Sequence, residues 1–266
     1  MGNVRHRSLL PANQPPTIEA AVRSVALTDV EPLSWENLSA SATLVATPCG
    51  APIRTIVTGR RVITTGVYAS RKAGRPQPYE SMNERAFFMH CEVDTEVLDC
   101  RAQPFRLEFV LEGRKRTYII DCVRLMADGS IEVVEVKSDR RALHVADYAD
   151  KLHAVREICA EVGWRFRLVF KKALMEPTAF HRNVMDIQSW RMTEYTNADV
   201  FRIVEALRST GSAVLGELVE HFASRPLGFA KLKAMMVGRI VTIDLTQQIG
   251  DATPVALVGG ATGGLR

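Results

Sequence analysis

Asp121, Glu135 and Lys137 are the residues whose types and spacing best fit a catalytic site. Glu135 and Lys137 are two positions apart in the strand-like run IEVVEVK, so both side chains point to the same face. Asp121 lies in the preceding run RTYIIDCVRL, and residues 127–130 supply an Asp-Gly turn of the kind that closes hairpins. In such a hairpin the numbers of facing residues sum to about 257. Asp121 is then expected opposite Val136, beside Glu135 and Lys137.

This set of side chains suits the metal-dependent hydrolysis of a phosphodiester. Carboxylates hold Mg²⁺, for which Mn²⁺ is an expected substitute, and the cation polarises a phosphate and acidifies water. An amine beside that water can position it and stabilise negative charge in the transition state. The apolar residues before Asp121 and Glu135 predict buried strands, in which a carboxylate needs a partner. A solvated strand face with alternating Glu and Lys gives the same letters, so both interpretations stay open here.

Glu84 is a third candidate carboxylate, on a segment expected to be helical. In YESMNERAFFMHCEVD the apolar residues fall mostly on one side of a helix. Ser81 is a plausible N-cap and Glu84 follows three positions later, which is the spacing of a capping box. Local pattern favours a cap and a catalytic ligand equally.

The elements around these residues predict an α/β fold. A helix is expected first, then three strands, a long amphipathic helix that ends at Gly163, and a fourth strand. Their residues are 79–94, 104–113, 116–125, 131–137, 143–162 and 164–170. The order predicts a restriction-endonuclease-like core, with a mixed sheet flanked by helices. Gln103, just before the second element, is expected to shape the entry to its strand, with a contact to the site or to DNA as the alternative.

A second pattern starts after a predicted linker at 175–196. Three helical segments at 197–210, 212–223 and 227–238 precede two strand-like runs, and this layout is typical of a winged-helix domain. The expected division is a partly flexible N-terminal arm, a nuclease domain, a winged-helix domain and a flexible tail, at 1–50, 51–175, 176–258 and 259–266.

Charge is distributed unevenly along the 266 residues, although the net charge is only +4. Residues 1–78 carry nine Lys and Arg against four Asp and Glu, whereas residues 79–170 carry fourteen against seventeen. Cations bind phosphates and carboxylates bind metals, so this division suits a nuclease. A solvated basic segment that binds nothing is the alternative. The candidate DNA-binding residues are Arg60, Arg61, Arg71, Lys72 and Arg75.

Cysteine usage and hydropathy exclude other classes. The five cysteines form no CxxC pair, which argues against a zinc ribbon and a disulfide framework. No apolar run reaches the ~18 residues of a membrane span, and the N-terminus lacks an apolar signal core. We expect no membrane partner and a cytoplasmic location.

Several short runs together resemble the N-terminal domain of TnsA-type endonucleases, subunits of heteromeric transposases with a PD-(D/E)XK core. The resemblance covers roughly residues 60–138 in order and spacing. Its pieces are the S-x-K-x-G-R run at Ser70–Arg75, Y-E-S-x-x-E at Tyr79–Glu84, E-x-D at Glu92–Asp94, Gln103-Pro104, Asp121, and E-V-K at 135–137.

The resemblance implies a role for each matched residue. Glu84, Asp121, Glu135 and Lys137 would be catalytic, and the three carboxylates would hold the metal. It implies cleavage of the 5′ strands at transposon ends, while a TnsB-like DDE-type transposase cuts the 3′ strands. It also implies a TnsC-like AAA+ regulator, bound through the C-terminal domain. The alternatives are a stand-alone restriction or repair nuclease, and a non-catalytic winged-helix regulator that binds DNA.

Overall fold

The computed structural model describes residues 17–26, 42–47, 51–54, 64–176 and 178–259. The chain divides into two compact units. The first unit contains residues 1–67, 77–84 and 98–170, and the second contains 68–76, 85–97 and 171–266. Within the described ranges no helix is long and apolar enough to cross a membrane.

A mixed sheet in the order β4-β7-β8-β9 forms the centre of the first unit. Its strands are β4 (Val97–Ala102), β7 (Cys122–Met126), β8 (Ile131–Lys137) and β9 (Arg165–Phe170). Strand β8 pairs antiparallel with β7 and parallel with β9. The crossover to β9 runs through the 3₁₀ turn η1 (Arg140–His144) and helix α3 (Ala146–Glu161). A mixed sheet with flanking helices is consistent with the predicted restriction-endonuclease-like core.

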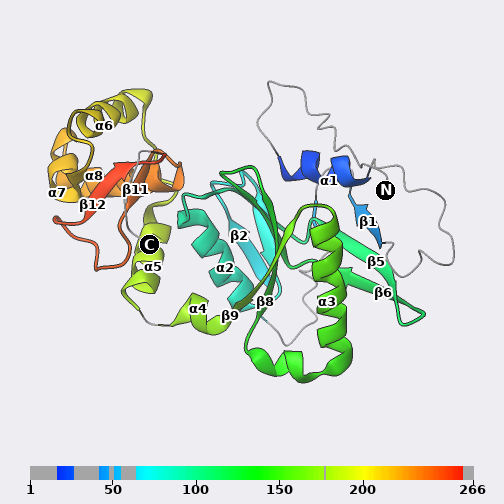
Figure 1. Ribbon diagram of the computed structural model, residues 1–266. Coiled ribbons are helices and arrows are strands. Elements are labelled where there is room, and N and C mark those ends of the chain that lie inside the picture. The colour runs from blue at the N-terminus through cyan, green and yellow to red at the C-terminus, as the bar shows by residue number, and fades with distance from the viewer. Residues whose placement is uncertain (1–16, 27–41, 48–50, 55–63, 177, 260–266) are drawn as a thin grey trace. The chain divides into compact units, whose positions relative to one another are not determined.

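Helix α3 covers the face of β8 that carries the predicted catalytic residues (Figure 1). Ile131 and Val133 point to this face and join one apolar cluster with Leu152 and Val155 of α3. Because side chains alternate along a strand, Glu135 and Lys137 point to the same face. Strand β8 is buried from Ile131 to Val136, so Glu135 lies within the fold and not on a solvated surface.

A second sheet in the order β1-β5-β6 changes one prediction. Its strands are β1 (Ala42–Ala46), β5 (Phe105–Leu111) and β6 (Arg114–Ile119). The sequence predicted one strand over 116–125, but this run is divided between β6 and β7. Strand β6 pairs with β5, whereas β7 pairs with β8. Asp121 therefore lies where the chain changes partner strands, not within a continuous strand.

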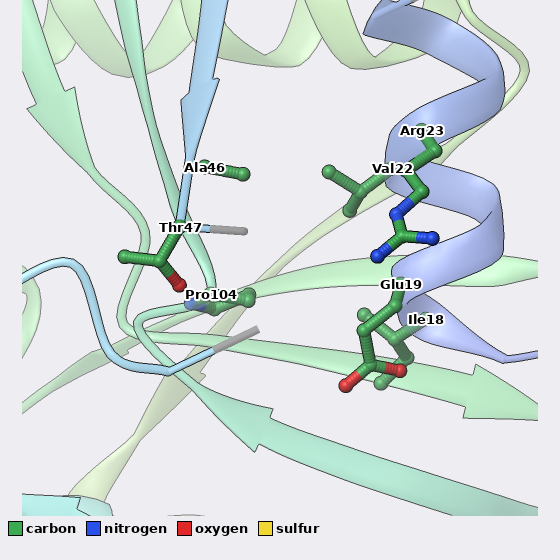
Figure 2. Close-up of a pocket in the computed structure, with 7 residues that line it drawn as sticks. All are labelled: Ile18, Glu19, Val22, Arg23, Ala46, Thr47 and Pro104. Atoms are coloured by element: carbon green, nitrogen blue, oxygen red, sulfur yellow. The ribbon is translucent and has the colours of Figure 1, made fainter. Parts of the chain in front are cut away.

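The described part of residues 1–50, where an arm was predicted, packs against the first unit. Helix α1 (Ile18–Ala26) buries Ile18 and Val22 in the same apolar cluster as β8, and β1 pairs antiparallel with β5. A small pocket lies between α1, the end of β1 and Pro104 (Figure 2). None of the predicted catalytic residues lines it.

Two strands and a helix lie between β1 and β4 in the chain. Strands β2 (Gly66–Ala69) and β3 (Pro76–Tyr79) pair with each other, and helix α2 (Met82–Val93) follows. The helix was expected over 79–94, and its first turn carries Glu84 as predicted.

The C-terminal part of the second unit contains more helix than the sequence indicated. The predicted linker at 175–196 contains α5 (Ala179–Trp190), preceded by α4 (Lys171–Met175). The N-cap side chain of Thr178 and the buried Val184 and Ile187 explain why α5 forms. Buried Asn183 interrupts its apolar stripe, because its amide donates to the carbonyls of Leu245 and Gln247.

The chain then forms helices and a small sheet in the order β10-β12-β11. Leu207, Leu215, Leu232 and Val241 are fully buried in this region. Figure 1 shows α6, α7 and α8 beside β11 and β12. The elements are α6 (Asn197–Thr210), β10 (Ala213–Val214), α7 (Leu215–Leu218), η2 (Val219–His221), α8 (Arg225–Val237), β11 (Val241–Ile243) and β12 (Pro254–Leu257). The tail predicted at 259–266 lies outside the described residues from position 260 on.

Candidate active site

Asp121, Glu135 and Lys137 come together at the junction of β7 and β8. The hairpin pairs Cys122 with Val134, so the register is one residue from the predicted one. Asp121 nevertheless reaches the predicted place, because its Oδ2 accepts the backbone N–H of Val136 at 2.9 Å. That bond anchors the Asp121 carboxylate beside the strand that carries Glu135 and Lys137.

Glu135 is enclosed by donors on both carboxylate oxygens. Glu135 as a whole is 2 % exposed to solvent. Oε2 accepts the hydroxyl of Tyr118, and Oε1 accepts the hydroxyl of Tyr148 at 2.6 Å. The ammonium of Lys137 forms an ion pair with Oε1 as well. A buried carboxylate is costly without partners, and these three donors compensate for the loss of water.

Burial and the neighbouring charges shift the pKa values of Asp121 and Lys137. Burial raises the pKa of Asp121 well above its ordinary value, and the negative charge of Glu135 raises it further. Burial by itself would lower the pKa of Lys137, but Glu135 and Asp121 reverse this effect and raise it. Lys137 therefore stays a cation at neutral pH, and the site has a pair of carboxylates that favours an additional positive charge.

Glu84 serves as the cap of α2. Its Oε1 accepts the hydroxyl of Ser81 at 3.0 Å, and its Oε2 accepts the backbone N–H of Glu80 at 2.8 Å. The Glu84 N–H returns a bond to Ser81 Oγ. Burial raises the pKa of Glu84, while the charge of Lys137 acts in the opposite direction. The capping interpretation thus describes the observed contacts, and Glu84 is also electrostatically coupled to Lys137 and Asp121.

Gln103 supports the backbone of Asp121. Its N–H donates to the Asp121 carbonyl at 3.0 Å, and its own carbonyl accepts from Ile53 at 2.9 Å. Its side-chain oxygen accepts from Arg54, whose guanidinium binds Glu80. Gln103 is buried and has a φ of 45°, a conformation in which a non-glycine residue is uncommon. Gln103 therefore supports the site through its backbone N–H, which binds the Asp121 carbonyl.

Arg71 and Lys72, predicted to bind DNA, have their charged groups occupied by the protein. Arg71 donates to the carbonyls of Arg191 and Thr193 and lies 4.6 Å from the ring centroid of Tyr195. The ammonium of Lys72 donates to the carbonyls of Cys91 and Asp94, at 2.8 and 2.6 Å. These contacts give both residues a structural role, and DNA binding by them stays a prediction. Arg75 is partly exposed, and Arg60 and Arg61 lie outside the described residues.

Glu92 joins two of the sequence motifs, the run at 70–75 and the E-x-D at 92–94. Glu92 is 2 % exposed, and its carboxylate accepts the Ser70 hydroxyl and the backbone N–H groups of Arg71 and Lys72. These motif residues bind one another within the second unit.

Tyr118 and Tyr148 are site residues that sequence reasoning missed. Tyr148 falls in the run 143–162 predicted as an amphipathic helix, and Tyr118 in the run 116–125 predicted as a strand. A tyrosine with a buried hydroxyl needs a hydrogen-bond partner, and this requirement was the only available signal. It did not identify Glu135 as that partner, because the three residues come from β6, β8 and α3.

The donor chemistry of the site fits a small divalent cation. Asp121 and Glu135 provide hard oxygen ligands of the kind Mg²⁺ takes. In the part of the chain that the structure describes, no three His, Cys, Asp or Glu side chains are arranged as a complete metal site. The oxygens of Glu84 face the cap donors, and those of Glu135 face the tyrosines and Lys137. Glu84 must therefore leave its cap donors to bind a cation, whereas Oε2 of Glu135, which accepts from Tyr118, has a second lone pair for one.

Comparison with known families identifies the fold around this site. Residues 94–171 match the family described as "TnsA-like endonuclease N terminal". This segment of the chain is similar to a TnsA-like endonuclease domain. The match includes Asp121, Glu135 and Lys137, whereas Glu84 precedes it. The similarity supports a nuclease that acts in transposition. None of the curated proteins matches the chain.

Proposed function

We propose that this chain is a metal-dependent DNA endonuclease that cleaves the 5′ strands at transposon ends, together with a partner transposase. The carrying observation is that Asp121, Glu135 and Lys137 converge inside the TnsA-like match. Burying the Glu135 carboxylate next to the partly buried Asp121 costs free energy, which a region with no function has no need to spend. Catalysis by these side chains would account for that cost.

The side chains divide the work of phosphodiester hydrolysis. Asp121 and Glu135 would hold Mg²⁺ or Mn²⁺, with Glu84 as the third ligand once it leaves its cap contacts. When bound, the cation would polarise the scissile phosphate and acidify water. Lys137 is a cation with a raised pKa, so it stabilises negative charge on the phosphate and does not accept a proton. Gln103 and Val136 hold Asp121 in place through backbone bonds.

The C-terminal elements support a winged-helix domain as the second part of the proposal. Helix α6, strand β10, helices α7 and α8 and the pair β11–β12 follow the order of that fold. The ammonium groups of Lys231 and Lys233 on α8 are paired with Asp199 and Asp186, each at 2.7 Å. Because these cations already have acidic partners, we propose that this domain binds protein, with a TnsC-like AAA+ regulator as the partner.

Metal binding by the purified chain tests the site directly. Asp121→Ala removes an expected ligand, so calorimetry should show Mn²⁺ affinity lowered by more than about tenfold, with the fold retained. Asp128→Ala is the matched control, because Asp128 lies on the exposed hairpin turn beyond β7. Equal Mn²⁺ affinity in the wild type and in Asp121→Ala would refute the assignment of this site.

A further inference from the structure

Two tyrosines from different elements converge on one carboxylate in the first unit. Tyr118 lies on β6 and donates to Oε2 of Glu135. Tyr148 lies in the first turn of α3 and donates to Oε1 at 2.6 Å. Each phenol has a single proton to donate, and each gives it to Glu135. Residues 30 positions apart in the chain thus share one acceptor, which a packing role alone does not require.

The rings of the tyrosines lie next to cations as well. The ammonium of Lys137 is 5.3 Å from the Tyr148 ring centroid. Lys151, one turn further along α3, lies 5.5 Å from the Tyr148 ring and 5.8 Å from the Tyr118 ring. These are cation–π distances, so each ring has an attractive contact beside the bond of its hydroxyl to Glu135.

We infer that Tyr118 and Tyr148 are positioning residues that fix the orientation of the Glu135 carboxylate for a divalent cation. The inference rests on the proposed function, in which Glu135 is a ligand. Groups that bond to metal ligands orient them, and their loss commonly weakens metal binding 10–100-fold. A buried carboxylate with one donor removed would rotate toward the remaining donors, so the geometry offered to the cation would change.

The two tyrosines differ in burial, which separates their roles. Tyr118 is 5 % exposed and is part of the apolar core, so it also contributes to stability. Tyr148 is only partly buried, and it connects the start of α3 to the site. Tyr148→Phe is therefore the variant that should fold normally, and it keeps the test decisive if Tyr118→Phe is unstable.

The test compares Mn²⁺ binding by calorimetry in the wild type, Tyr118→Phe, Tyr148→Phe and a control. Tyr68→Phe is the matched control, because Tyr68 is also 5 % exposed and gives its hydroxyl to Gln188, which is not an expected metal ligand. We expect each site variant to lose 10–100-fold in Mn²⁺ affinity, and the control to keep wild-type affinity. Cleavage of DNA should show a lower kcat with an unchanged KM for DNA, which general loosening of the fold would not produce.

The outcomes separate this inference from the proposed function. Unchanged or tighter Mn²⁺ binding in folded Tyr148→Phe, with weakened binding in Asp121→Ala, would overturn the inference and leave the nuclease proposal standing. An equal loss in Tyr68→Phe would overturn it too, since the effect would be nonspecific. A wild-type chain that binds no Mn²⁺ would overturn both.

Discussion

Lys137 carries a positive charge that the site itself stabilises. Its ammonium pairs with Glu135, and the charges of Glu135 and Asp121 raise its pKa despite burial. The side chain is 26 % exposed, so a phosphate can reach it from solvent. A permanent cation beside two carboxylates has a clear use where negative charge develops on a phosphate during the reaction.

Replacing Lys137 should separate metal binding from hydrolysis. Lys137→Ala removes no expected ligand, so Mn²⁺ should still bind while the cleavage rate falls by about 100-fold or more. Calorimetry and single-turnover cleavage, measured on the same preparation, check this. Lys115→Ala is the control, because that lysine is on the exposed end of the β5–β6 hairpin. A Lys137→Ala chain that cuts at the wild-type rate would show that Lys137 is not catalytic.

At the scale of elements, Lys72 fixes the loop before β3 to the end of α2. Its ammonium donates to the carbonyls of Cys91 and Asp94, groups at a helix end that lack intrahelical partners. Burial lowers the pKa of Lys72 from 10.5 to about 8. The negative charges of Glu92 and Asp94 reduce this shift, and the positive charge of Arg239 increases it. Loop and helix are thus joined through a titratable group.

Stability should therefore depend on Lys72 at alkaline pH. Folded Lys72 loses its proton near pH 8 and the unfolded side chain near pH 10.5, so between these values the unfolded state binds more protons. The free energy of unfolding of the wild type, relative to Lys72→Met, should rise across this window by at most roughly 3 kcal/mol. Urea unfolding at several pH values measures it. A difference between the two chains that stays constant from pH 7 to 10 would contradict the lowered pKa.

At the scale of the whole molecule, function should depend on a partner. The TnsA-like match supports a nuclease in transposition, and a transposon nuclease that cut DNA freely would damage its host. The sequence shows no dedicated reader of a long DNA site of the kind restriction enzymes carry. Control of cleavage is then expected to come from a second protein.

The purified chain should nick DNA poorly and without sequence preference. Addition of the proposed partner transposase should produce 5′-strand cuts at element ends, seen by mapping the cut strands. Glu135→Ala should abolish these cuts and leave 3′-strand cutting intact, because the partner performs that step. Efficient cutting of one defined sequence by the chain alone would favour a stand-alone nuclease instead.

Local patterns in the sequence predicted β8, the strand that carries Glu135 and Lys137, together with β5 and α3. Strand β8 has the predicted bounds, because alternation and the Asp-Gly turn are local signals. The predicted bounds of β5 and α3 also agree with the structure within a few residues, and the Ser81–Glu84 cap forms as predicted. Since Glu135 and Lys137 share one short strand, their common face needed no long-range information.

Contacts between distant segments decided the rest. The break at Asp121 arises because β6 and β7 pair with different strands, and the two tyrosines reach Glu135 from elements far apart in the chain. The sequence does not indicate whether Arg71 and Lys72 face solvent or backbone carbonyls. Only the folded chain shows that they bind carbonyls. A sequence specifies which groups can donate and accept, but burial and pairing between remote residues determine which of them meet.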